Sequence, residues 1–263
     1  MVKRVMAMDG MAQTAWVGEM ESWFAFGAAP EASGLASAER GPGMVCVWWL
    51  DEPGRMENNL VISPDEAGDP DVAFASLGER LDASRAATDL RLPAEGGVAA
   101  WVSAAQRRGF VLEGVDPIMA SDLTERACVS RMLVRVVPAD DTGTHDRAAD
   151  VIEAVWGDPG ICRFFAPPSA TRLFLAERDG RSIGAATTFR CDDLVCIFSV
   201  TTLPKYRKQG VAHALLHGIA EEERARGAQW AIVRTVDGLV SFYEHAGFRT
   251  VIREQRYRRP AIV

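Results

Sequence analysis

The stretch Ser199-Val200-Thr201-Thr202-Leu203-Pro204-Lys205-Tyr206-Arg207-Lys208-Gln209-Gly210-Val211-Ala212 decides the fold of the second half of this chain. An apolar strand (194–201) enters it, and a helix (211–226) with apolar residues at i, i+4 and i+8 leaves it. The first N–H groups of a helix lack intrahelical acceptors, and the helix dipole is positive at that end. The stretch therefore predicts a loop that can hold a pyrophosphate, although a generic basic turn before a helix is the simpler alternative.

Turn and periodicity signals around this stretch give an ordered series of elements. The second half predicts a strand at 128–137, a helix at 146–156, a hairpin of 173–177 with 182–189, a strand at 194–201, a helix at 211–226, a strand at 230–233, a helix at 239–245 and a strand at 248–257. The order is thus strand, helix, three-strand meander, helix, strand, helix, strand.

The first half alternates helices and strands in a similar rhythm. It predicts a helix at 12–26, a loop at 31–43, a strand at 44–50, a turn at 51–54, a pairing strand at 59–62, a helix at 72–81, a strand at 89–92, a helix at 98–108 and a strand at 110–112. Both halves contain a helix that ends in Gly-Phe before a strand, at Gly109-Phe110 and Gly247-Phe248. We therefore expect two related domains, 1–127 and 128–263.

Length and composition fit two globular domains. The 263 residues correspond to roughly 1.8 domains of about 150 residues, and the 48% hydrophobic and 25% charged content is that of a folded soluble chain. No apolar stretch is long enough to cross a bilayer, and no signal peptide is evident. The five scattered cysteines include no C-x-x-C pair, so we expect neither disulfides nor a zinc site, and a cytoplasmic location.

Charge is distributed unevenly. The net charge is -7, with 10 basic and 20 acidic side chains in residues 1–127 and 19 basic and 16 acidic ones in 128–263. This balance disfavours a nucleic-acid partner and directs a small polyanion to the second half. The sequence gives no indication of the oligomeric state.

The spacing Arg207-x-x-Gly210-x-Ala212 after Pro204 resembles the acyl-coenzyme A loop of the GNAT acyltransferases. At the family's distance follows the segment 242–248, Phe-Tyr-Glu-His-Ala-Gly-Phe, which is similar to the family's Y-E-x-x-G-F segment. The resemblance covers about residues 130–258. It implies an α/β (α+β) fold of two tandem GNAT-like domains, each a mixed, mostly antiparallel sheet flanked by helices and the second with its fourth and fifth strands splayed apart.

The resemblance also assigns binding residues for acetyl-CoA or another acyl-CoA. The acyl-pantetheine arm would pair with the backbone of the fourth strand, and backbone amides of the loop would hold the pyrophosphate. Asp237 stands in the region where the family often has an asparagine that contacts the arm, and this departure puts that contact in doubt. The implied cofactor-binding residues are Ser199, Val200, Thr201, Thr202, Arg207, Lys208, Gln209, Gly210, Val211, Ala212 and Asp237.

Tyr243 matches the position of the family's frequent general acid, which would protonate the departing thiolate; packing under its helix is the alternative. Several members of the family use a glutamate on the fourth strand as general base, and this strand has none. Asp192 and Asp193 are more easily read as a solvated turn than as the base, and a water relay would suffice. His213 and His217 lie i, i+4, but no third ligand is indicated, so no metal is expected.

The first half resembles the same fold only in rhythm. No comparable basic loop precedes its helices, and Ser103 is taken as the residue at the tyrosine-equivalent place, seven residues before Phe110. We expect a degenerate partner domain that walls the acceptor cleft, with a charge of -10 that suits a cationic acceptor. The sequence thus predicts an N-acetyltransferase acting on a primary amine of a small molecule by direct attack. A catalytically silent acyl-CoA sensor or scaffold is the alternative.

Overall fold

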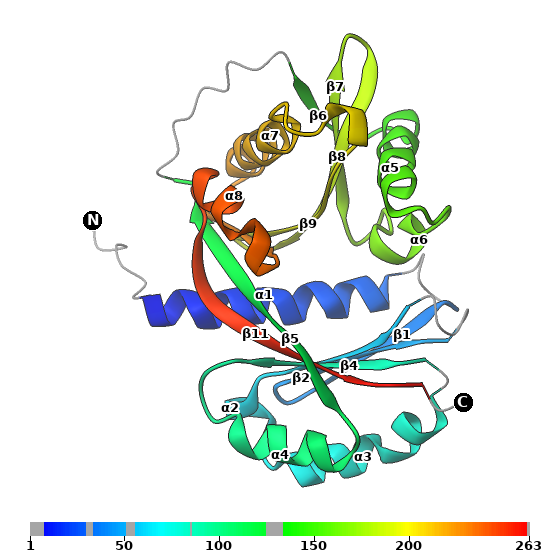
Figure 1. The fold of residues 1–263 in the computed structure, drawn as a ribbon, viewed down its shortest axis with the longest axis vertical. Helices are drawn as coiled ribbons and strands as arrows, with labels where there is room; N and C mark the ends of the chain where they lie inside the picture. Colours follow the sequence, from blue (N-terminus) through cyan, green and yellow to red (C-terminus); the bar gives the residue numbers. More distant parts are fainter. Residues whose placement is uncertain (1–7, 30–33, 51–55, 85, 125–133, 262–263) are drawn as a thin grey trace. The chain divides into compact units, whose positions relative to one another are not determined.

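A computed structural model describes residues 8–29, 34–50, 56–84, 86–124 and 134–261, and it divides into two compact units. Unit 1 comprises residues 1–118, 235–237 and 250–263, and unit 2 comprises residues 119–234 and 238–249. Figure 1 traces the elements of both units in chain order. No helix among the described residues is long and apolar enough to span a membrane.

Unit 1 is a mixed sheet with helices on both faces (Figure 1). Its strands run in the order β1-β2-β3-β4-β11-β5, and β3 and β4 are parallel, whereas the pairs β1–β2, β2–β3 and β4–β11 are antiparallel. The elements are α1 (Met8–Ala28), β1 (Ala36–Gly41), β2 (Met44–Trp49), β3 (Asn58–Ile62), α2 (Pro64–Ala67), α3 (Pro70–Ala83), β4 (Thr88–Pro93), α4 (Ala99–Arg107), β5 (Val111–Asp122) and β11 (Arg249–Arg259).

The two faces of the unit 1 sheet differ in character because successive side chains of a strand point to opposite sides. On one face Leu90 and Leu92 of β4 pack with Phe74 of α3 and Trp101 of α4 in a buried apolar core. On the other face Asp89 and Arg91 are buried, and the Arg91 guanidinium lies 5.1 Å from the ring centroid of Trp23 in α1. Unit 1 therefore buries charge beneath α1.

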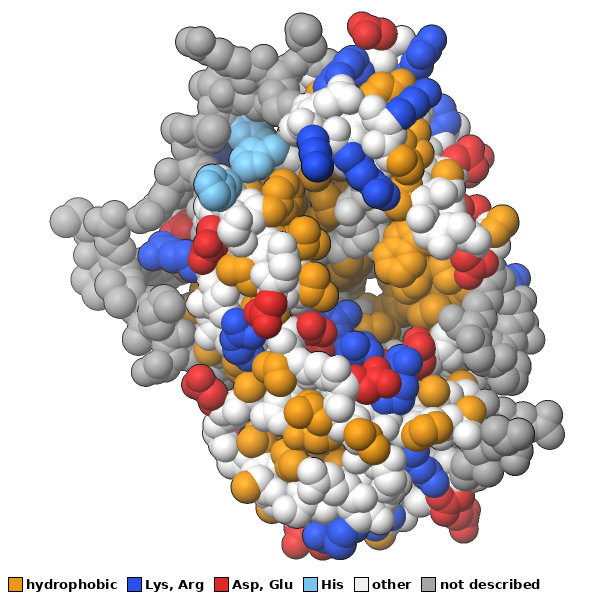
Figure 2. Space-filling view, viewed as in Figure 1, with side chains coloured by type: hydrophobic (Ala, Val, Ile, Leu, Met, Phe, Trp, Pro, Cys, Tyr) orange, Lys and Arg blue, Asp and Glu red, His pale blue; other side chains and the backbone are white. Residues whose placement is uncertain are grey.

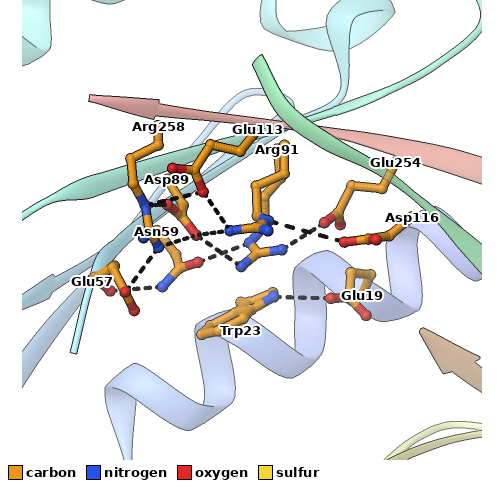
Figure 3. Close-up of polar contacts among 11 residues, drawn as sticks. Glu19, Trp23, Glu57, Asn59, Asp89, Arg91, Glu113, Asp116, Glu254 and Arg258 are labelled. Atoms are coloured by element: carbon orange, nitrogen blue, oxygen red, sulfur yellow. Dashed lines mark hydrogen bonds and ion pairs between the residues drawn. The ribbon is translucent and has the colours of Figure 1, made fainter. Parts of the chain in front are cut away.

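A network of ion pairs and hydrogen bonds satisfies this buried charge (Figure 3). The Arg91 guanidinium donates to Glu254 Oε1 at 2.5 Å and to Asn59 Oδ1 at 2.8 Å, and Arg258 Nε donates to Asp89 Oδ1 at 2.9 Å. Since these partners come from β3, β4 and β11, the network ties the last strand of the chain into the sheet of unit 1.

Unit 2 is a mixed sheet in the strand order β10-β9-β8-β7-β6, antiparallel except for the parallel pair β9–β10. Apolar residues of α5 pack on one face, with Leu173, Leu175 and Ala185, and those of α7 pack on the other, with Phe174 and Ala186. The elements are β6 (Arg135–Pro138), α5 (Thr142–Trp156), α6 (Cys162–Phe165), β7 (Arg172–Arg178), β8 (Arg181–Cys191), β9 (Leu194–Thr202), η2 (Pro204–Tyr206), α7 (Val211–Ala225), β10 (Trp230–Arg234), η3 (Asp237–Leu239) and α8 (Val240–His245).

The predicted helices and strands that lie within the described residues are present in the predicted order, and the structure adds the short helices α2 and α6. The hairpins β2–β3 and β7–β8 pair as expected. The turn at 51–54 and most of the predicted strand at 128–137 lie outside the described residues. Part of the predicted loop at 31–43 is instead the edge strand β1, and the predicted strand at 110–112 is the start of the longer β5.

The compact units also differ from the expected division at residue 127. The boundary along β5 falls between Ile118 and Met119, and residues 250–263 belong to unit 1. The physical reason is the strand β11, because Glu254–Arg259 pair residue by residue with Pro93–Thr88 of β4. The last predicted strand exists, but its pairing partner lies in the first half of the chain.

Candidate functional site: the strand edge and anion loop of unit 2

The strand β9 has an unpaired edge at its C-terminal end. Its parallel pairing with β10 stops at Ile197 and Val233, whereas β9 continues to Thr202. The strand β10 itself ends at Arg234, so the predicted splay between the fourth and fifth strands of this domain stays a prediction. Residues 198–202 offer backbone N–H and C=O groups to an extended ligand, as the edge of a sheet does to an added strand. Four of the predicted cofactor-binding residues, Ser199–Thr202, lie on this edge.

A β-bulge bends this free edge. Thr187 pairs with Phe198 and Ala185 with Thr201, so Ser199 and Val200 together oppose one residue of β8. Ser199 takes the left-handed conformation, with φ of 52°, and its carbonyl accepts a hydrogen bond of 2.6 Å from Thr201 Oγ1. A bulge redirects the backbone groups of the strand that carries it, and here it does so where the strand is unpaired.

The loop that follows β9 presents consecutive backbone amides. Lys208 and Gly210 are both left-handed, with φ of 58° and 76°, and such alternation turns successive N–H groups toward one side. The first helical bond of α7 runs from Ala214 N–H to the Gly210 carbonyl. Within the part of the chain that the structure describes, the N–H groups of residues 208–212 have no hydrogen-bond acceptor. We call residues 204–212 the anion loop, since these free donors meet the positive end of the α7 dipole.

Cationic side chains surround the anion loop. Lys205, Arg207 and Lys208 are exposed, and the β7–β8 hairpin adds Arg178 and Arg181. Figure 2 shows Lys and Arg side chains gathered over this part of unit 2, in the upper region of the view. A hydrogen bond from Arg181 lowers the pKa of the Tyr206 hydroxyl below its ordinary value, with Lys205 contributing further lowering. The potential at the loop is positive and suits phosphate groups.

Two glycines let α7 lie close to the sheet. A Cβ on Gly184 of β8 would stand 2.8 Å from Val211 Cγ1 and 2.9 Å from the Thr201 carbonyl oxygen. A Cβ on Gly218 of α7 would stand 2.7 Å from Val136 of β6. The first turn of α7, and hence the row of free amides, is held at a fixed depth beside the free edge of β9.

Tyr243 lies on α8 with 8% of its surface exposed. Its ring centroid is 5.0 Å from that of Phe242 and 5.8 Å from that of Phe248, and Phe242 in turn contacts the ring of His213 in the first turn of α7. Burial raises the pKa of the Tyr243 hydroxyl to about 12. That hydroxyl has no hydrogen-bond partner among the described residues, so a buried, protonated donor stands on a helix that contacts the head of α7.

Asp237 lies at the start of η3 and is assigned to unit 1. Its carboxylate pairs with Arg253 at 2.9 Å, and 68% of its side chain is exposed. The Asp237 carboxylate is therefore already paired with Arg253. The predicted contact between Asp237 and a cofactor stays a prediction.

The other candidate residues from the sequence do not lie on the free edge of β9. Asp192 and Asp193 form the turn between β8 and β9, where the Asp193 carbonyl accepts from Gln229 and Trp230. The turn precedes β9, so at about 3.3 Å per residue Asp193 is roughly 20 Å from Ser199. The interpretation of Asp192 and Asp193 as a turn is therefore confirmed. His217 lies near Glu221, and among the described residues no group of three His, Cys, Asp or Glu side chains could hold a metal.

Unit 1 repeats the same order of elements without the same site. A three-strand meander, a helix, a parallel strand, a helix and a strand follow one another in both halves of the chain, and the last strand of the second series, β11, belongs to unit 1. In unit 1 the pairing of β3 with β4 reaches Val61, one residue before β3 ends, so no comparable free edge exists there. At the head of α3 the Asp69 carboxylate accepts from the N–H groups of Asp71 and Val72. A carboxylate thus occupies the position that an anion would need.

The tyrosine-equivalent residue of unit 1 is Ala105 rather than Ser103. Phe248 N–H donates to the Tyr243 carbonyl at 3.0 Å, and Phe110 N–H donates to the Ala105 carbonyl at 3.1 Å. The two helix ends therefore match with a spacing of five residues, and the seven-residue count that pointed to Ser103 was wrong. Ser103 is exposed, and its hydroxyl donates to the Ala99 carbonyl of its own helix.

Residues 162–260 match the family model described as Acetyltransferase (GNAT) domain. This match agrees with the resemblance drawn from the loop and tyrosine motifs, and it places the similarity to the GNAT acetyltransferase domain in the C-terminal part of the chain. None of the curated proteins compared with the chain matches it.

Solved structures share the fold across both units. A GCN5-related N-acetyltransferase from Kribbella flavida superposes with a TM-score of 0.64 at 16% identity, over 92% of this chain and 96% of its own. One from Sphaerobacter thermophilus gives 0.61 at 16% identity over 95% of each chain. A functionally unknown conserved protein from Staphylococcus epidermidis gives 0.59 at 12% identity over 86% of this chain and 95% of its own. The mixed α/β fold class is thereby confirmed.

Proposed function

We propose that this chain is an N-acyltransferase that binds acetyl-CoA in unit 2 and transfers the acetyl group to a primary amine of a small cationic molecule. The observation that carries the proposal is the run of free amides at 208–212, which follows the unpaired edge of β9 after the short turn of residues 203–207. Together they form one surface suited to an extended amide-containing arm that ends in a pyrophosphate.

In this proposal the pantetheine arm pairs with backbone groups of residues 198–202, and the pyrophosphate accepts hydrogen bonds from the anion loop. The thioester carbonyl then lies near the bulge at Ser199, where the backbone is redirected. Arg207 and Lys208 balance the phosphate charge, since neither side chain has an ion-pair partner among the described residues.

The amine nitrogen attacks the thioester carbon, the new C–N bond forms, and the C–S bond breaks as the tetrahedral intermediate collapses. Tyr243 gives its hydroxyl proton to the departing thiolate, and the pKa of about 12 keeps that hydroxyl protonated at neutral pH. The acceptor ammonium loses one proton before attack and a second as the amide forms; one of these goes to solvent and the other restores the Tyr243 hydroxyl. Because β9 offers no acidic side chain between Leu194 and Thr202, water is the proposed route for both protons.

Unit 1 is proposed to be a degenerate acyltransferase domain that serves the acceptor rather than the acyl donor. The capped head of α3, the full β3–β4 pairing and Ala105 in place of a tyrosine support one acyl-CoA per chain. The charge of -10 over residues 1–127 favours a positively charged acceptor. The proposed setting is the cytoplasm, with no nucleic acid or membrane partner.

Titration calorimetry with acetyl-CoA tests the proposal without knowledge of the acceptor. We expect one site per chain of micromolar affinity, about -8 kcal/mol, that Gly210→Glu abolishes. Gly157→Glu is the matched control, because Gly157 has a similar φ of 71° at the end of α5. No heat, together with no competition by free coenzyme A, would contradict the proposal. Binding without release of free thiol across a panel of amines would favour the sensor or scaffold alternative.

A further inference from the structure

The anion loop contains a conformation that its sequence does not favour. Lys208 is left-handed, with φ of 58°, although it is not a glycine, and such residues persist only where surrounding contacts hold them. The free amides at 208–212 depend on this conformation, because it turns the chain between η2 and α7. A specific set of contacts must therefore maintain it.

The side chain of Gln209 supplies such contacts on both of its polar atoms. Its Oε1 accepts a hydrogen bond of 2.8 Å from the Arg178 guanidinium at the end of β7, and its Nε2 donates to the Lys205 carbonyl at 2.9 Å. Gln209 thus spans from the β7–β8 hairpin to the start of its own loop.

Arg178 is available for this role because it has no ion pair among the described residues, and its Nε is buried without a hydrogen-bond partner. Gln209 Oε1 is the acceptor that the structure provides for this guanidinium. The charge of Arg178 remains uncompensated beside the anion loop. The residue therefore acts on the loop both through the hydrogen bond and through its charge.

We infer that Arg178 and Gln209 form a bracket that preorganises the anion loop, and that Gln209 is a positioning residue for acyl-CoA binding through its side chain. A preorganised loop loses less conformational entropy when it binds its ligand. The inference rests on the proposed function, since it takes acyl-CoA as the ligand of the loop.

The experiment compares Gln209→Ala with Gln106→Ala, a matched change at an exposed glutamine of α4. We expect Gln209→Ala to raise the Kd for acetyl-CoA roughly five- to tenfold, as expected for the loss of one or two hydrogen bonds. The melting temperature and the kcat at saturating acetyl-CoA should stay unchanged. Gln106→Ala should change none of these. An unchanged Kd in Gln209→Ala would overturn the inference alone, whereas a wild-type protein that does not bind acetyl-CoA would overturn the proposed function as well.

A double-mutant cycle separates the bracket from simple charge. If Arg178 acts through Gln209, the combined variant Arg178→Ala with Gln209→Ala should bind more tightly than the product of the two single effects predicts. If the effects of the two substitutions on the binding free energy are strictly additive, Arg178 acts only through its charge, and the inference that it positions the loop through Gln209 is wrong.

Limited trypsin digestion without ligand gives an independent readout of order in the loop. Cleavage after Lys205 and Arg207, whose flanking residues the substitution leaves intact, should be faster in Gln209→Ala than in wild type and Gln106→Ala. Equal rates in all three proteins would show that Gln209 does not order the loop.

Discussion

Ala105 and Tyr243 occupy the same position in two matching helix ends, each accepting a hydrogen bond from the N–H of the phenylalanine five residues later. Both side chains are buried. The two positions therefore differ in chemistry and not in exposure, because Tyr243 has a phenol where Ala105 has a methyl group. Unit 2 thus has a phenol hydroxyl where unit 1 has only a methyl group, and the same unit contains the free amides and the unpaired strand edge.

Replacing Tyr243 with Phe should lower kcat roughly 100-fold, because the departing thiolate loses its proton donor. The Kd for acetyl-CoA should stay within about twofold, because the phenyl ring keeps its contacts with Phe242 and Phe248. Tyr257→Phe, which removes a hydroxyl bonded to Gln255 in unit 1, is the control. Thiol release with an identified amine acceptor measures the effect, and full activity in Tyr243→Phe would remove this residue from the chemistry.

The raised pKa of Tyr243 also has a consequence for stability. Its folded pKa of about 12 exceeds the ordinary value of 10, so the unfolded chain loses this proton first as the pH rises. The stabilisation is complete below pH 10 and is lost between pH 10 and 12, by up to roughly 3 kcal/mol. Urea unfolding of wild type and Tyr243→Phe should therefore show a steeper alkaline loss for wild type. Parallel curves would mean that the hydroxyl is more accessible to water than its burial indicates.

Gly184 sets the depth at which α7 begins. Gly184→Ala would place a Cβ 2.9 Å from the Thr201 carbonyl oxygen, which is backbone and cannot turn away. We expect a loss of roughly 1–3 kcal/mol in unfolding free energy and weaker acetyl-CoA binding, because the head of α7 must shift. Gly78→Ala, in the open interior of α3, should be neutral or slightly stabilising. Thermal unfolding measures the stability of the two variants, and calorimetry measures their affinity for acetyl-CoA. An unchanged affinity in Gly184→Ala would show that acetyl-CoA binding does not depend on how closely α7 packs against the sheet.

The site of unit 2 could be predicted because its chemistry is local in sequence. The strand 194–202, the loop 204–210 and the helix from Val211 follow one another without a break, so their residue types alone indicate free amides at a helix start. The left-handed conformation of Lys208 could not be predicted, because glycine is the usual left-handed residue. The hydrogen bond from Arg178 to Gln209 could not be predicted either, because the two residues are 31 positions apart in the sequence.

The parts of unit 1 that escaped prediction depend on distant pairing. The strand β1 is rich in Ala, Ser and Gly and carries little strand propensity, yet its pairing with β2 defines it. The place of β11 beside β4 joins residues separated by more than 160 positions, which no local pattern reports. Its alternating charges at Glu254, Arg256 and Arg258 are complementary to a buried polar face of the sheet, a feature visible only once both strands are placed.

The Arg91–Glu254 pair should be a principal support of that buried face. Its atoms lie 2.5 Å apart with 6% and 0% of the two side chains exposed, whereas the Arg107–Asp71 pair, at 2.7 Å, is 58% and 62% exposed. Removing one partner of a buried pair leaves an uncompensated charge and costs roughly 3–5 kcal/mol, against about 0–1 kcal/mol for an exposed pair. Arg91→Ala should therefore destabilise unit 1 strongly in urea unfolding and expose β11 to proteolysis after Arg253 and Arg256, while Arg107→Ala should do neither. Equal small losses in the two variants would show that the sheet holds β11 by backbone pairing alone.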